Sequence, residues 1–125
     1  MMHCVFVYGT LRLGGANHAY LRMGRFLGRF TTPASYTMLN VGQYPGVVDG
    51  GRDAIHGEVY MVNPRILQRL DRLEDVPRSY HRARLETPWG LAWWYVFRPA
   101  GLCLPRIGGG DWLRRPIGVA RSYRC

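Results

Sequence analysis

The chain has 125 residues, enough for one domain with its own hydrophobic core. An apolar share of 47%, with 16 glycines and 8 prolines, is typical of a turn-rich globular protein and excludes a disordered chain. No apolar run reaches the length of a membrane span, and the N-terminus lacks the regions of a signal peptide, so we expect a cytoplasmic protein with no membrane partner.

The formal net charge is +9, and all 17 basic residues are arginine. They are spread along the chain, whereas nucleic-acid binding favours a basic stripe interleaved with aromatic residues. Nucleic acid is therefore not expected as the main partner, and the same positive field suits a small anionic substrate. The cysteines and histidines lack metal-ligand spacing, so no metal site is predicted, and the cysteines are expected to be free thiols or apolar filler.

The first predicted strand is the apolar run Val5-Phe6-Val7, which stops at Gly9. A flexible loop over 13–17 follows and ends on Asn17, the expected N-cap of a short helix over 17–24. A strand that runs into a glycine turn and a helix leaves several backbone N–H groups without ladder or helix partners. In a cleft, such donors bind a carboxylate or a developing oxyanion.

Strands are predicted next over 25–31 and 34–39, with a turn at 43–48, a loop at 49–53 and a strong strand over 54–62. One face of this last strand carries Ile55, Gly57, Val59 and Met61, and the other carries His56, Glu58, Tyr60 and Val62. The imidazole, carboxylate and phenol on the second face either line a cleft or face solvent, and solvent is favoured for each taken singly.

Residues 63–74 form the clearest predicted helix, with Asn63 as its cap and Pro64 at its first position. Its apolar stripe consists of Ile66, Leu67, Leu70 and Leu73. The helix is expected to end near 75–77.

A hairpin of strands over 79–87 and 90–98 follows, and its aromatic residues supply much of the core. We expect one domain over 1–113 and a mobile C-terminal tail over 114–125. Strands dominate, so the predicted class is α+β, with a small, closed or half-closed, mostly antiparallel β-barrel flanked by a few helices.

Glu74 lies on the edge of the helical stripe, four residues after Leu70 and seven after Leu67. If it faces a cavity, desolvation raises its pKa above about 4.3, which suits a group that takes and returns a proton near neutrality. Alternatively, it is a helix-end carboxylate bonded to backbone or paired with Arg78 or Arg82. The spacing alone leaves both interpretations open.

Tyr80 and Tyr95 could place hydroxyl groups near a cleft, although core packing is the commoner role of such residues. The sequence lacks the G-x-S-x-G and H-E-x-x-H patterns and any local cysteine–histidine signature. The common hydrolase and zinc-protease chemistries are therefore not predicted.

In order and spacing, these segments resemble the gamma-glutamylcyclotransferase-like family, and most closely its small bacterial and gamma-glutamylamine-type members. The shared blocks are VFVYGTLR at 5–12, HGEVY at 56–60, LDRLE at 70–74, AWWYV at 92–96 and GDW at 110–112. The resemblance covers about residues 3 to 113.

The resemblance implies a compact β-barrel flanked by helices, with a cavity between the first loop and the helix that bears the acidic residue. It also implies a reaction without metal or organic cofactor, in which the α-amine of a γ-glutamyl group attacks its own γ-carbonyl. This closes 5-oxoproline and expels an amine or amino acid. By position, Glu74 matches the catalytic acid/base. The residues expected to bind the substrate are Tyr8, Gly9, Thr10, Leu11, Tyr80 and Tyr95.

The chemistry of this reaction suits the residues, because an α-ammonium must lose a proton before it attacks and one carboxylate can pass that proton to the leaving amine. The loop amides would hold either the anionic end of the substrate or the γ-oxyanion. The sequence departs from the family at 13–15, a less polar loop, and at Asp75, where glycine is common. A non-catalytic module that binds a small anion in the same cavity is the alternative function. The leaving group and the oligomeric state are not predicted.

Overall fold

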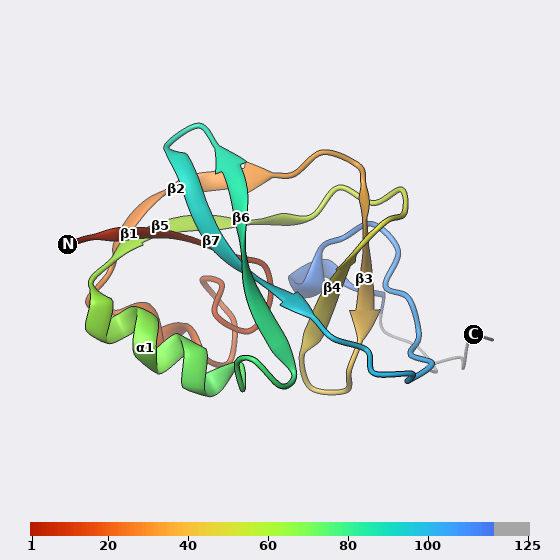
Figure 1. Ribbon diagram of the computed structural model, residues 1–125. Coiled ribbons are helices and arrows are strands. Elements are labelled where there is room, and N and C mark those ends of the chain that lie inside the picture. The colour runs from red at the N-terminus through yellow and green to blue at the C-terminus, as the bar shows by residue number, and fades with distance from the viewer. Residues whose placement is uncertain (117–125) are drawn as a thin grey trace.

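The computed structural model, described here for residues 1–116, contains a five-stranded sheet in the order β2-β5-β1-β7-β6 and a separate β3-β4 pair (Figure 1). The strands of the large sheet are β1 (His3–Val7), β2 (Arg25–Thr31), β5 (His56–Val62), β6 (Tyr80–Thr87) and β7 (Gly90–Phe97). The pair consists of β3 (Tyr36–Asn40) and β4 (Pro45–Asp49). The helices of the described chain are α1 (Pro64–Leu73) and the short 3-10 turns η1 (His18–Leu21) and η2 (Trp112–Arg114).

Strand β1 occupies the centre of the large sheet, antiparallel to β5 and parallel to β7. Val5 and Val7 pack into the core on the side of α1, whereas Phe6 and Tyr8 pack into the second core with Trp94. A three-residue apolar run is therefore buried on both faces, as its composition predicts. The loop that follows β1 therefore starts from the central strand of the sheet.

Helix α1 packs its apolar stripe against β1 and lies at the lower left of Figure 1, with the β3–β4 pair on the right. The Asn63 side chain accepts a hydrogen bond from the Ile66 N–H at 2.8 Å, and Pro64 is the first helical residue, so the predicted start of the helix is confirmed. The helix ends with Glu74 as its C-cap residue.

The short helix predicted over 17–24 is only the four-residue turn η1; Asn17 is its N-cap residue by position, as predicted, but not by side-chain bonding. The Asn17 side chain makes no capping bond; instead its amide donates to the Thr10 hydroxyl at 3.0 Å. This bond ties the loop after β1 to the start of η1. The Asn17 side chain therefore bonds to the loop in place of the backbone N–H groups of η1.

The expected barrel is not confirmed, because the described strands form an open sheet whose edges are β2 and β6. The β3–β4 pair approaches β7 without joining its ladder. A Cβ placed on Gly46 in β4 would lie 2.5 Å from the Phe97 ring, so a side chain occupies the space between the two sheets. The α+β class is correct, with β-structure predominant.

No helix within residues 1–116 is long and apolar enough to cross a membrane. Cys4 is a free thiol. Cys103 is disulfide-bonded, so the expectation of free thiols is wrong at that position. The tail predicted over 114–125 lies outside the described residues from 117 onward.

Candidate active site

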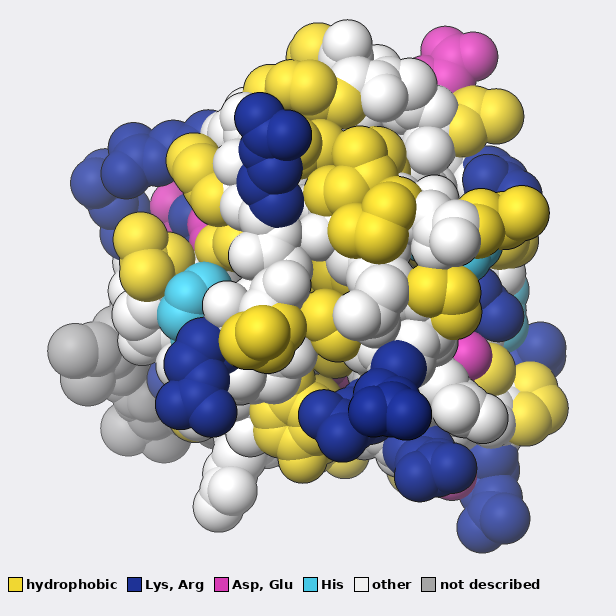
Figure 2. Space-filling model, turned by 90° about the vertical axis from the view of Figure 1, so that its left-hand side faces the viewer, with side chains coloured by type: hydrophobic (Ala, Val, Ile, Leu, Met, Phe, Trp, Pro, Cys, Tyr) yellow, Lys and Arg dark blue, Asp and Glu magenta, His cyan; other side chains and the backbone are white. Residues whose placement is uncertain are grey.

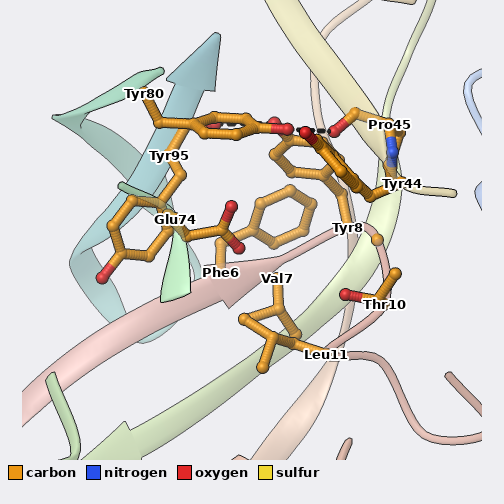
Figure 3. A pocket seen from close by; sticks show the side chains of 11 residues that line it. Phe6, Val7, Tyr8, Thr10, Leu11, Tyr44, Pro45, Glu74, Tyr80 and Tyr95 are labelled. Carbon is orange, nitrogen blue, oxygen red and sulfur yellow. Dashed lines mark hydrogen bonds between the residues drawn. The ribbon is translucent and has the colours of Figure 1, made fainter. Parts of the chain in front are cut away.

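A pocket with an empty volume of about 330 Å³ lies where the loop after β1 faces the C-terminal end of α1 (Figure 3). Its lining residues are Phe6, Val7, Tyr8, Gly9, Thr10, Leu11, Tyr44, Pro45, Glu74, Tyr80 and Tyr95. Every site residue predicted from the sequence is among them. The sequence reasoning missed Tyr44 and Pro45, which the 43–48 turn brings over the pocket from β4.

The Glu74 carboxylate points into this pocket toward the Phe6 ring, below the ring of Tyr80 (Figure 3). It forms no hydrogen bond or ion pair with any described residue. Arg82, one of its two suggested partners, pairs instead with Asp71, at 3.2 Å between Nε and Oδ1. The cavity-facing interpretation of Glu74 is therefore the one that the geometry supports.

Burial raises the pKa of Glu74 from its ordinary value of 4.5 to about 7. The cause is desolvation, and no arginine of residues 1–116 forms an ion pair with the carboxylate to stabilise its charged form. The position at the C-cap of α1 acts in the same direction, since the negative end of the helix dipole disfavours an anion. Near neutral pH the group can therefore both accept and donate a proton.

The loop after β1 presents backbone donors to the same pocket. The amide N–H groups of Gly9, Thr10 and Leu11 have no acceptor among the described residues, while the loop itself is closed by bonds from Arg12 N to Gly9 O (3.1 Å) and from Asn17 N to Thr10 O (2.8 Å). A Cβ on Gly9 would lie 2.8 Å from the Pro45 ring, so only glycine leaves this wall of the pocket undisturbed. Unpaired amides beside a cavity suit an anionic oxygen.

Three of the four pocket tyrosines contribute their rings, because the hydroxyl groups of Tyr8, Tyr80 and Tyr95 are already bonded to protein. Tyr8 donates to the Tyr95 carbonyl at 2.7 Å, Tyr80 donates to the Pro45 carbonyl at 2.6 Å, and Tyr95 donates to Asp71 Oδ1 at 2.8 Å. Burial raises the pKa of all three phenols, so they remain protonated donors. Figure 3 shows the Tyr95 hydroxyl directed away from the pocket. Substrate contact by these residues remains a prediction, and it would involve ring surfaces.

A family model described as gamma-glutamyl cyclotransferase, AIG2-like, matches residues 5–114. The chain belongs to this family. A curated relative from Vibrio cholerae, to which the name gamma-glutamylcyclotransferase is assigned provisionally, is 47% identical over 115 residues, covering 92% of this chain and 99% of its own. Bovine gamma-glutamylaminecyclotransferase is 39% identical over 90 residues, covering 65% of this chain and 54% of its own. The crystal structure of an AIG2-like protein from Mus musculus matches with a TM-score of 0.77 at 29% identity, covering 98% of this chain and 97% of that one.

A second, outer chamber adjoins the pocket of this family member, with an empty volume of about 750 Å³. The two share Thr10, Tyr44, Glu74 and Tyr80. The outer chamber adds Ala16, Asn17, Gln43, Leu73, Asp75 and Ser79. Its described lining holds two acidic residues, Glu74 and Asp75, several neutral polar ones, and no arginine. The Glu74 carboxylate thus stands at the junction of an inner and an outer space.

The polar residues of β5 lie elsewhere. Glu58 and Tyr60 are each 4% exposed, so the interpretation that they face solvent is wrong. His56 is half-buried and contacts the Thr31 hydroxyl at 3.2 Å. Within residues 1–116, no group of three histidine, cysteine or acidic side chains is arranged to hold a metal ion.

The arginines of the face shown in Figure 2 are interspersed with hydrophobic and neutral side chains. Such a distribution gives a diffuse positive field, which attracts small anions without forming a track for a polyanion. The absence of a nucleic-acid partner stays a prediction.

Proposed function

We propose that this protein is a gamma-glutamyl cyclotransferase that releases 5-oxoproline from a γ-glutamyl amine or γ-glutamyl amino acid, with Glu74 as general acid/base. The observation that supports this most strongly is an unpaired, desolvated carboxylate that shares a pocket with the free amides of a glycine loop. Family membership adds the reaction class.

The reaction is an internal transfer of an acyl group. The substrate α-ammonium gives a proton to the Glu74 carboxylate, and the amine nitrogen then bonds to the γ-carbonyl carbon. The ring nitrogen loses a second proton as the tetrahedral intermediate breaks its original C–N bond, and the departing nitrogen receives both protons by way of Glu74 and leaves as an ammonium group. No water, electron or further reactant is consumed. A general acid–base group of this kind contributes about 10²–10⁴-fold in rate.

The position of Glu74 supports an assignment of the two chambers to the two halves of the substrate. The bond that breaks must lie beside the proton donor, and Glu74 lines both chambers. The inner pocket, which the loop of residues 9–11 lines, then takes the γ-glutamyl group folded toward a five-membered ring. The outer chamber then receives the leaving group. The amides of residues 9–11 would bind the α-carboxylate or the γ-oxyanion.

The test is release of 5-oxoproline from a panel of γ-glutamyl amines and dipeptides, by wild-type protein and Glu74→Gln. We expect turnover by the wild type and a loss of about 10²-fold or more in Glu74→Gln, because the amide cannot carry the proton. Glu86→Gln is the matched control, since Glu86 is an exposed carboxylate on β6. An active, folded Glu74→Gln protein would remove Glu74 from the mechanism.

The alternative, a non-catalytic module for a small anion, draws on the same unpaired amides. It predicts calorimetric binding of a γ-glutamyl ligand with no 5-oxoproline formed from any member of the panel. Independence from cofactors and a cytoplasmic location also stay predictions; activity that survives treatment with a chelator would support the first.

A further inference from the structure

A buried charge cluster stands outside both chambers and has no part in the proposed proton transfer. Glu58, at the centre of β5, accepts a hydrogen bond from Arg12 Nε, and Arg12 Nη1 donates to Asp111 Oδ1 at 2.8 Å. The side chains of Arg12, Glu58 and Asp111 are only 12%, 5% and 23% exposed. Three segments far apart in the sequence therefore meet at one guanidinium group.

The cluster binds the loop after β1 through a backbone N–H group as well as through the Arg12 side chain. Glu58 Oε1 accepts a hydrogen bond from the Leu13 N–H at 2.8 Å, next to the bond from Arg12. Glu58 belongs to a strand paired on both sides, with β1 and with β2. One carboxylate on a rigid strand thus fixes the end of the loop whose amides line the pocket.

The loop needs such an anchor because its own sequence does not hold it. Residues 9, 14 and 15 are glycines, whose backbone is conformationally free. The hydrogen bonds within the loop are turn bonds, which do not fix the position of the loop relative to the sheet. Amides stabilise an anionic group well only when they are already oriented before the reaction. A displacement of about 1 Å can cost on the order of 10²-fold in rate.

We propose that Arg12, Glu58 and Asp111 are positioning residues that hold the amides of Gly9 to Leu11 in place for the proposed cyclotransferase reaction. This inference rests on the proposed function. A planar guanidinium serves two carboxylates in fixed directions, which the single ammonium of a lysine cannot do. The cluster therefore acts through the loop and touches no substrate.

The test compares Arg12→Lys, which keeps the charge, and Glu58→Gln, which keeps the shape, with the control Asp53→Asn. Asp53 is 8% exposed, and its carboxylate forms a two-bond ion pair with Arg106, at 2.7 and 3.0 Å, and no bond with residues 9–17. We expect Arg12→Lys and Glu58→Gln to lower kcat/KM for 5-oxoproline release by about 10²-fold with an unchanged pH midpoint, and Asp53→Asn to leave kcat/KM unchanged.

Backbone ¹⁵N relaxation supplies a second measurement that does not depend on turnover. In wild type, the amides of 9–13 should show order parameters near 0.85, and in Glu58→Gln values below about 0.6, whereas Asp53→Asn should leave them unchanged. If Glu58→Gln does not fold, Asp111→Asn, which removes a single bond from the cluster, should give a smaller change in the same direction.

An ordered loop in both Glu58→Gln and Arg12→Lys would overturn the proposal, as would an equal loss of kcat/KM in Asp53→Asn. If the wild type itself forms no 5-oxoproline, the proposed function fails while the relaxation data still decide whether the cluster orders the loop.

Discussion

Replacing Glu74 by glutamine is expected to stabilise the protein above neutral pH while it lowers turnover by about 10²-fold or more. Burial raises the pKa of Glu74 from 4.5 to about 7, so the folded state holds the proton more tightly than the unfolded state does. Between these two values the folded protein binds more protons than the unfolded chain, and the free energy of unfolding therefore falls as pH rises. Glutamine has no charge to desolvate, so in Glu74→Gln the free energy of unfolding does not fall for this reason.

The magnitude follows from the difference between the two pKa values. Each pKa unit corresponds to about 1.4 kcal/mol at 25 °C, which sets an upper limit of about 3 kcal/mol for the cost of the ionised carboxylate above pH 7. Glu74 keeps partial contact with solvent, which reduces the penalty. We expect Glu74→Gln to be about 1–3 kcal/mol more stable than wild type at pH 8 and to differ little from it at pH 4.

Urea denaturation of both proteins at pH 4, 6 and 8 measures this difference directly, with Glu86→Gln as the exposed control. The gain should appear between pH 4.5 and 7 and then level off. A variant that is no more stable than wild type at pH 8, or a gain that is equal at all three pH values, would refute the claim that Glu74 is a desolvated carboxylate.

Three other predictions concern the pocket. In wild type, kcat/KM should fall tenfold per pH unit below a midpoint near 7, because the base must be ionised; a midpoint near 4.5 would contradict the raised pKa of Glu74. Tyr8→Phe leaves two buried backbone groups without a partner and should cost about 1–3 kcal/mol in urea denaturation; unchanged stability would show that water replaces the hydroxyl. Gly9→Ala forces a Cβ to within 2.8 Å of the Pro45 ring and should lower kcat/KM about tenfold or more with the fold retained in circular dichroism, whereas full activity would mean that this wall yields freely.

The elements with strong local patterns were predictable from the sequence. Asn63, Pro64 and a helical apolar stripe are local signals, and they place Glu74 at the end of α1. The burial of β1 on both faces follows from its uninterrupted apolar run. Spacing alone could not show which way the Glu74 side chain points, since a residue on the edge of a stripe has room on either side. The resemblance to the family indicated that Glu74 faces a cavity, and the position of its side chain in the pocket supports that orientation.

Features that depend on contacts distant in sequence were not predictable. Tyr44 and Pro45 reach the pocket only because β4 packs across β7, and nothing in their local sequence encodes that contact. Asn17 has the character of a helix cap, yet it bonds to the Thr10 hydroxyl. Asp75 has a φ of 53°, in the region that favours glycine, which explains why glycine is common there; here its side chain accepts a hydrogen bond from the Ser79 hydroxyl at 2.9 Å.

The isolation of Glu74 is notable in a chain with 17 arginines and 8 acidic residues. Four of the eight carboxylates pair with an arginine among the described residues, and of the other four, Asp49, Asp75 and Glu86 are exposed whereas Glu74 is not. Within residues 1–116, Glu58 and Asp111 share Arg12, Asp71 binds Arg82 and Asp53 binds Arg106.

An arginine in ion-pair contact with Glu74 would lower the pKa of the carboxyl group by about 1–3 units. The carboxylate would then be too weakly basic to take a proton from an ammonium near neutrality. In the proposed mechanism, the rings of Tyr8, Tyr80 and Tyr95 therefore serve the chemistry as well as the shape of the inner pocket. They supply apolar surface beside Glu74. Their hydroxyl groups are bonded to backbone and to Asp71, so none of them donates a hydrogen bond to the Glu74 carboxylate before the substrate arrives.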